Sequence, residues 1–286
     1  MGVVLGKAMN STVSVLTIKG TGRPYLSSAL RSLVNQDLRE WESVVIDSCS
    51  KPEDSLMVAR QVAEVADDRV KILRYDGPGG FPPYASKKWN FGISRSVGGL
   101  IAFLDSDDMK GPGWLSAMCG PLIADKSLSA TLSSGHVIDS AGTIRSGLFR
   151  EPSLDLAYLL GPNFVTTGQI VVRRSVIEAM GGFDESLGCS EDWEFCLRLS
   201  KMSWRHVDGI KCLKRETGDN ACYHPNVVEY TQDVLRRIIS KHGIAPGSCH
   251  ECGKRFPEGY APFVWAVAGL GFRLWHSKCA IEKQRK

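Results

Sequence analysis

The feature that most constrains the fold is the stretch from Gly99 to Asp108, GLIAFLDSDD, in which an apolar run leads directly into three carboxylates. Residues 101–104 are typical of a strand that is buried on both faces of an α/β sheet. Such strands carry their chemistry at their carboxyl ends. Acidic groups crowded there repel one another unless a cation lies among them, so Asp105, Asp107 and Asp108 indicate a site for Mg²⁺ or Mn²⁺. The alternative is that these residues only cap the helix that follows.

The sequence around this strand predicts an α/β protein. Strand-forming and helix-forming segments alternate along the first half, and a strand–helix–strand order implies parallel strands joined by right-handed crossovers. The predicted strands are residues 13–17, 43–46, 70–73, 101–104, 131–138 and 169–172. The predicted helices are residues 25–36, 53–66, 87–96 and 190–199. We therefore expect a mostly parallel, Rossmann-like sheet flanked by helices.

Composition narrows the class of protein further. The chain has 286 residues, 43% hydrophobic and 23% charged, which is the profile of a soluble globular protein with one α/β domain and a small appendage. The net charge of +4 is too small to indicate nucleic-acid binding by itself. We see no signal peptide and no span long enough to cross a bilayer, so a cytoplasmic location is expected. The nine cysteines are mostly scattered, which favours free thiols over a disulfide framework.

The C-terminal segment has the spacing of a zinc site. Cys249 and Cys252 form a CxxC pair, and His276 and Cys279 form an HxxC pair, with His250 as a competing ligand. Four such donors suit tetrahedral Zn²⁺, which would supply folding energy that about forty residues cannot obtain from a core. Gly and Pro in residues 242–248 mark the boundary. We expect a main domain over 1–242 and a structural, zinc-finger-like module over 243–286.

Six phrases together resemble a known family. In chain order they are YLSSALRSLVNQ, VVIDSCS, KKWNFGI, IAFLDSDD, GGFDE and SEDWEFCLRL. In this order and spacing, from about residue 13 to about residue 215, the chain resembles the family 2 glycosyltransferases of the GT-A fold. The resemblance implies a nucleotide-sugar donor, UDP- or GDP-linked, and a divalent ion, Mn²⁺ or Mg²⁺.

The resemblance places several residues at the donor. Asp47 matches the carboxylate that the family uses at the nucleobase, where it can accept the imide N–H of uracil or the N–H groups of guanine. Ser48 stands where a second acidic residue is common, which leaves the nucleotide open. Asn90 matches a family asparagine near the donor. Lys19 ends the first strand in place of the usual Pro-Thr turn, and we expect it on the donor side as well.

Asp105-Ser106-Asp107 matches the DxD motif of the family. By resemblance, Asp107 is the direct ligand of the divalent ion on the diphosphate, and Asp105 contacts the ribose or the waters of the metal. The ion would neutralise charge that develops on the departing nucleoside diphosphate.

Glu191-Asp192 matches the ED motif. An acceptor hydroxyl must lose its proton as it attacks the anomeric carbon, and a carboxylate held opposite the leaving group can take that proton. We expect Asp192 to be this base, with inversion at the anomeric carbon, and Glu191 to assist at the acceptor or donor sugar. Acidic residues at a helix N-terminus are also favourable to the helix dipole, so the structural and catalytic interpretations are compatible.

Five basic residues carry weaker expectations. Lys87 and Lys88 stand near a position where the family often has arginine, although a solvated surface lysine is the default interpretation. Arg198 is expected to pair with a nearby acid. Arg215 and His224 lie where some family members close a flexible loop over the diphosphate.

Three functions follow from these features. The leading one is an inverting, metal-dependent glycosyltransferase acting on a protein or glycan hydroxyl. A second is the same enzyme acting on modified DNA, with the zinc module gripping the nucleic acid. A third, from another class, is a non-catalytic binding protein on the same fold, against which the intact DxD and ED motifs count.

Overall fold

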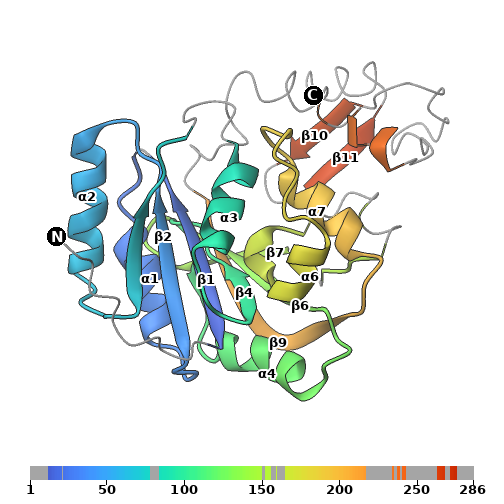
Figure 1. The fold of residues 1–286 in the computed structure, drawn as a ribbon, viewed down its shortest axis with the longest axis horizontal. Coiled ribbons are helices and arrows are strands. Elements are labelled where there is room, and N and C mark those ends of the chain that lie inside the picture. Colours follow the sequence, from blue (N-terminus) through green and yellow to red (C-terminus); the bar gives the residue numbers. More distant parts are fainter. Residues whose placement is uncertain are drawn as a thin grey trace.

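The computed structural model describes residues 12–20, 22–77, 84–149, 152–155, 159, 165–216, 234, 237–238, 240–242, 263–267 and 271–275. Its centre is a nine-stranded sheet with helices on both faces (Figure 1). The strand order is β3-β2-β1-β4-β8-β6-β9-β5, and β7 pairs with β6.

The first half of the sheet is parallel, as the sequence predicts. It consists of β1 (Val13–Lys19), β2 (Trp41–Asp47), β3 (Val70–Arg74) and β4 (Leu100–Phe103). In this register Lys19 lies opposite Asp47 and Leu16 opposite Phe103. The ends of β1, β2 and β4 therefore meet at one edge of the sheet, which brings the segments after them together.

The second half of the sheet is mixed, and here the expectation of a mostly parallel sheet is wrong. Its strands are β5 (Met109–Lys110), β6 (Ala130–Ile138), β7 (Ile144–Phe149), β8 (Ile170–Arg173) and β9 (Trp204–Arg215). The pairs β4–β8, β8–β6, β6–β7 and β5–β9 are antiparallel, and only β6–β9 is parallel. The likeness to a Rossmann sheet ends at β4.

Two apolar cores lie on opposite faces of the sheet. One core is formed with α1 (Leu26–Val34), α2 (Pro52–Ala63) and α4 (Trp114–Ala124). The other is formed with α3 (Ala85–Ser94), α6 (Arg174–Ala179) and α7 (Glu191–Leu199). Side chains of β1 alternate between the two, with Val15 in the first and Leu16 in the second. This alternation explains why the central strands are buried on both faces.

Three smaller features complete the described chain. A 3₁₀ turn, Thr167–Gln169, leads into β8. In the C-terminal region β10 (Phe263–Val267) pairs antiparallel with β11 (Gly271–Trp275). The five described cysteines outside that region form no disulfide: Cys49, Cys119, Cys189, Cys196 and Cys212. Within the described residues, no helix combines the length and apolar character needed to cross a bilayer.

Candidate active site

The three aspartates lie in a turn at the carboxyl end of β4. The Leu104 N–H donates to the Leu16 carbonyl, which continues the sheet one residue past the strand. The chain then turns, with the Asp108 N–H donating to the Asp105 carbonyl at 3.1 Å. The helix that follows begins at Trp114 after Gly113, and no side chain caps it. The aspartates therefore do not cap this helix, which was the alternative interpretation.

Arg215 holds this turn in place. Its backbone N–H donates to Asp108 Oδ1 at 2.8 Å, and its Nε donates to the Asp107 carbonyl at 2.8 Å. The guanidinium also donates to the Asp139 carbonyl at 2.7 Å and lies over the Tyr25 ring, 4.4 Å from the centroid. Arg215 is buried at the end of β9. In this structure its side chain donates to backbone carbonyls, and a part in closing a loop over the diphosphate stays a prediction. His224 lies outside the described residues.

The three aspartates after β4 have both positive and negative neighbours. Asp107 is buried and ion-paired with Arg23. Burial raises the pKa of Asp105, and the charge of Asp107 raises it further, while Lys214 acts in the opposite direction. Burial likewise raises the pKa of Asp108 to about 7. Three carboxylates in this turn thus favour the presence of positive charge.

Glu191 and Asp192 form the first turn of α7. Ser190, just before them, has a left-handed backbone (φ 56°), which turns the chain into the helix. Asp192 Oδ1 accepts the Trp193 N–H at 2.8 Å. Both carboxylates are half-buried. Their position at a helix N-terminus favours the ionised form, and burial opposes it.

The turn after β4 and the ED pair interact electrostatically. Burial raises the pKa of Glu191 to about 8, and the charges of Asp192 and Asp105 raise it further. Burial raises the pKa of Asp192 to about 7, with Asp105 raising it and Lys214 lowering it. Asp105 therefore acts on both residues of the ED pair. The turn after β4 and the start of α7, 86 positions apart in sequence from Asp105 to Glu191, face a common site.

Lys214 is a site residue that the sequence did not indicate. Burial alone would lower its pKa, but Asp108, Asp105 and Asp107 raise it well above its ordinary value. It therefore stays charged among the carboxylates and acts on Asp192 as well. It precedes Arg215 on β9, a strand rich in charged residues that follows no simple alternation. The pairing of β9 with β6 and β5 brings it to the site.

Local hydrogen bonds hold the side chains at the ends of β1 and β2. Lys19 is buried, and its ammonium donates to the Gly20 and Gly22 carbonyls, which organises the loop after β1. Asp47 accepts the Cys49 N–H at 3.0 Å and a guanidinium N–H of Arg74 at 3.1 Å. Burial would raise the pKa of Asp47, but these hydrogen bonds lower it, so the carboxylate stays ionised. Arg74 is a neighbour that sequence inspection missed.

Asn90 on α3 clamps the loop before α7. Its Nδ2 donates to the Phe183 carbonyl at 2.9 Å, and its Oδ1 accepts the Phe183 N–H at 2.8 Å. A second 2.9 Å contact reaches Glu185. A donor contact by Asn90 stays a prediction, since in this structure its amide serves the loop.

The two neighbouring lysines of α3 differ. Lys88 is buried, which lowers its pKa, while the charge of Glu191 raises it. The default interpretation of a solvated lysine is therefore wrong for Lys88, which lies toward the ED pair. Lys87 instead lies over the Tyr84 ring, 4.9 Å from the centroid.

The donor set at β4 fits a divalent ion. Carboxylate oxygens are the ligands that Mg²⁺ and Mn²⁺ prefer, and crowding already raises the pKa values of Asp105 and Asp108. Among the described residues, no three Asp, Glu, His or Cys side chains are gathered as a ready-made metal cage. This is compatible with an ion that takes one or two carboxylates and completes its shell with phosphates and water. The four zinc-ligand candidates Cys249, Cys252, His276 and Cys279 lie outside the side chains that the structure describes.

Comparison with known proteins identifies the family. The model of glycosyl transferase family 2 matches residues 15–181, more than half of the chain. The pre-mycofactocin glycosyltransferase of Mycobacterium tuberculosis is 26% identical over 268 residues, covering 87% of this chain and 49% of that protein. The O-antigen biosynthesis protein RfbC of Myxococcus xanthus is 24% identical over 66% of this chain and 14% of its own length. The chain spans about half the length of the first of these relatives and a smaller share of the second. It belongs to glycosyl transferase family 2.

Solved structures share the fold. The S. aureus TarS fragment 1–349 in complex with UDP-GlcNAc has a TM-score of 0.59 at 20% identity, covering 80% of this chain and 66% of that one. The mannosyltransferase PcManGT from Pyrobaculum calidifontis, in complex with GDP-Man and Mn²⁺, has a TM-score of 0.58 at 16% identity. That match covers 89% of this chain and 68% of that one. The chain thus has the fold of GT-A glycosyltransferases, with a mixed sheet as found above.

Proposed function

We propose that this protein is an inverting, divalent-metal-dependent glycosyltransferase that moves one sugar from a nucleoside diphosphate to an acceptor hydroxyl. The observation that carries the proposal is the shared environment of the turn after β4 and the start of α7. Asp105 raises the pKa of both Glu191 and Asp192, so the proposed ion site and the proposed base are near one another. A transferase needs this arrangement, because the leaving group and the attacking hydroxyl meet at one carbon.

The donor would lie along the ends of β1, β2 and β4. Asp107 and Asp105 would hold the ion, which when bound supplies Lewis-acid stabilisation to the departing diphosphate. Asp47, kept ionised by Cys49 and Arg74, offers an acceptor to a nucleobase N–H. The complexes of TarS with UDP-GlcNAc and of PcManGT with GDP-Man support a nucleotide sugar without choosing between uracil and guanine.

Asp192 would act on the acceptor. Its carboxylate takes the hydroxyl proton as the acceptor oxygen forms its bond to the anomeric carbon and the bond to the diphosphate oxygen breaks. Attack opposite the leaving group inverts that carbon. Glu191, whose pKa is raised to about 8, would be protonated at neutral pH and could donate a hydrogen bond to a sugar hydroxyl.

A donor panel and two variants test this function. UDP- and GDP-sugars with Mn²⁺ are compared for thermal stabilisation, since a bound ligand raises the apparent stability. Hydrolysis or transfer is then measured for the donor that binds. Asp107→Asn and Asp192→Asn should abolish turnover while circular dichroism shows an intact fold. Full activity in either variant refutes the role assigned to that residue, and no response to any donor favours the non-catalytic binding protein.

The acceptor remains a protein or glycan hydroxyl in this proposal, with modified DNA as the second candidate. DNA binding through the C-terminal module would weaken steeply with salt and disappear when residues after Ser248 are deleted. DNA binding that survives the deletion would show that the C-terminal module is not the DNA-binding part. The cytoplasmic location stays a prediction, to be checked by cell fractionation.

The zinc module over 243–286, distinct from a main domain over 1–242, is likewise a proposal. Purified protein should contain about one zinc per chain by elemental analysis. Cys252→Ser should remove this zinc, whereas Cys189→Ser, which alters a half-buried cysteine of the main domain, should keep it. Zinc that is absent from the wild-type protein would contradict the proposal.

A further inference from the structure

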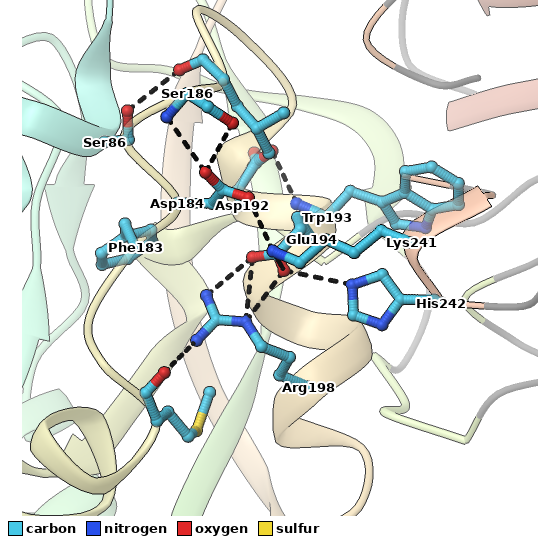
Figure 2. A network of polar contacts seen from close by, with 12 residues as sticks. Ser86, Phe183, Asp184, Ser186, Asp192, Trp193, Glu194, Arg198, Lys241 and His242 are labelled. Atoms are coloured by element: carbon cyan, nitrogen blue, oxygen red, sulfur yellow. Dashed lines mark hydrogen bonds and ion pairs between the residues drawn. The ribbon is translucent and has the colours of Figure 1, made fainter. Parts of the chain in front are cut away.

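The α7 helix also carries a buried carboxylate, that of Glu194. Glu194, two positions after Asp192 on α7, has a fully buried side chain that Arg198, Lys241 and His242 contact (Figure 2). Arg198 binds both of its oxygens at 2.7–3.0 Å. The ammonium of Lys241 is 2.9 Å from Glu194 Oε1, and His242 Nε2 is 3.1 Å from the same oxygen. Burial would raise the pKa of Glu194, but these partners lower it, so the carboxylate stays ionised.

Lys241 makes a second contact on a different segment. Its ammonium is 2.6 Å from Asp184 Oδ2, in the loop that precedes α7. The Asp184 carboxylate also accepts the N–H and hydroxyl of Ser186. Burial would lower the pKa of Lys241, yet the two carboxylates raise it. One ammonium therefore joins the loop before α7 to the helix itself, although it lies 47 residues beyond Glu194 in sequence.

We call the contacts of the Lys241 ammonium with Glu194 and Asp184 the Lys241 clasp. Helix geometry relates this clasp to the position of Asp192, the proposed base. Successive residues of an α-helix are separated by about 100°, so Glu194 and Asp192 project from nearly opposite sides of α7. Asp192 shares its environment with Asp105, while Glu194 is anchored on the other side by Lys241 and Arg198. Ser190, the N-cap residue of α7, makes no side-chain capping hydrogen bond. Contacts from elsewhere in the chain therefore help to hold the angle and depth of the first turn.

We propose that Lys241 is a positioning residue for glycosyl transfer, which fixes the first turn of α7, and with it Asp192, by clasping Glu194 and Asp184 together. The inference rests on the proposed function, because it concerns the placement of the proposed base. Without Lys241, Glu194 keeps its paired contact with Arg198, and α7 keeps Phe195, Leu197 and Leu199 in the core. The fold should survive, but the helix start would lose its tie to the preceding loop.

The chain offers a matched control for this clasp. Lys71 on β3 is 55% exposed and binds Glu42, which is 2% exposed, at 2.9 Å. Lys241 is 47% exposed and binds a fully buried glutamate at the same distance. Both substitutions, Lys241→Met and Lys71→Met, thus remove an exposed ammonium from a buried carboxylate. Glu42 belongs to the opposite end of β2 from Asp47, away from the proposed site.

The experiment compares kcat and KM with thermal stability in the full chain. The probe is Mn²⁺-dependent hydrolysis of whichever of UDP-GlcNAc, UDP-glucose and GDP-mannose stabilises the protein. We expect both variants to lose similar stability, while only Lys241→Met lowers kcat, by about ten- to a hundredfold with donor KM within about twofold, as displaced catalytic groups do. Lys241→Arg should restore most of kcat. A Lys241→Met variant whose kcat falls no further than that of Lys71→Met overturns the inference.

Asp192→Asn separates this inference from the function on which it rests. If Asp192→Asn is inactive and Lys241→Met behaves like Lys71→Met, only the positioning role fails. If Asp192→Asn keeps the wild-type kcat, the base assignment fails, and the positioning of Asp192 by Lys241 fails with it.

Discussion

The guanidinium of Arg23 is ion-paired with the carboxylate of Asp107, the residue expected to ligate the divalent ion. Arg23 holds a left-handed backbone conformation (φ 51°), which is costly for a residue with a Cβ. The loop that carries it is tied down by Lys19 through the Gly20 and Gly22 carbonyls. A positive side chain is thus directed onto an oxygen that a metal ion would use.

Arg23→Gln should therefore bind Mn²⁺ more tightly in the absence of donor. The ion pair is partly buried and its replacement by a neutral side chain removes a competitor worth up to about 1 kcal/mol, so the Kd for Mn²⁺ should fall about two- to fivefold. Free Mn²⁺ is measured by electron paramagnetic resonance during titration. Arg23→Lys keeps the charge and serves as the control. Equal Mn²⁺ affinity in wild type and Arg23→Gln would show that the pair does not oppose the metal.

The activity should depend on pH through Asp192. A general base must be ionised, and burial raises the pKa of this carboxyl to about 7, so it is protonated below that pH. We expect kcat/KM to fall as the pH is lowered through about 7, because kcat/KM reports the free enzyme. Lys214 lowers the pKa of Asp192, so Lys214→Met should move this acid limb to higher pH. A limb that stays in place, or moves to lower pH, would contradict the assignment.

The parallel half of the sheet could be predicted from the sequence because its forces are local. The central strands are buried and largely apolar, and α1 is amphipathic, so the sequence of each element indicates its type without its partners. The positions of Asp47, Asp105 and Asp107 then follow from where those strands end. The pairing of Arg198 with a nearby acid, expected from the sequence, is confirmed by its contact with Glu194.

The remaining elements and site residues depend on tertiary contacts that the sequence pattern does not show. In α4 an apolar sequence containing Pro121 gives no helical period, so the pattern did not predict the extent of this helix. The strand β9 is rich in charged residues and contains Gly209, which has a positive φ, and its pairing with β6 shifts register on the way. The roles of Lys214 and Arg215 arise only once that pairing places them beside the aspartates.

Asp184 should stabilise the fold only above acidic pH. Burial would raise its pKa, but Lys241 and Ser186 lower it to about 2, below the ordinary value of 3.8. A depressed folded-state pKa gives stability that is present above the unfolded value and is lost as pH falls from about 4 toward 2. Since Lys241 is half-exposed, we expect about 1 kcal/mol at pH 7. Urea unfolding should show Asp184→Asn less stable than wild type at pH 7, with a difference that shrinks steadily between pH 4 and pH 2. A difference that stays constant over that range would point to packing instead of charge.

Two adjacent glycines should respond differently to alanine. Gly181 and Gly182 both have left-handed backbones, with φ of 77° and 75°. A Cβ at Gly181 meets nothing within 4 Å, whereas one at Gly182 would lie 2.6 Å from Asn90 Oδ1. That oxygen cannot retreat freely, because the Asn90 amide holds both the N–H and the carbonyl of Phe183.

Gly181→Ala should therefore lose about 1–2 kcal/mol of unfolding free energy from the backbone alone, and Gly182→Ala should lose more. The extra loss should shrink in the double variant Gly182→Ala/Asn90→Ala, because the atom that the new Cβ would strike is gone. Urea unfolding of all four variants, including Asn90→Ala alone, measures this coupling. Additive losses for Gly182→Ala and Asn90→Ala would mean that the loop before α7 yields to the methyl group without involving the Asn90 clamp.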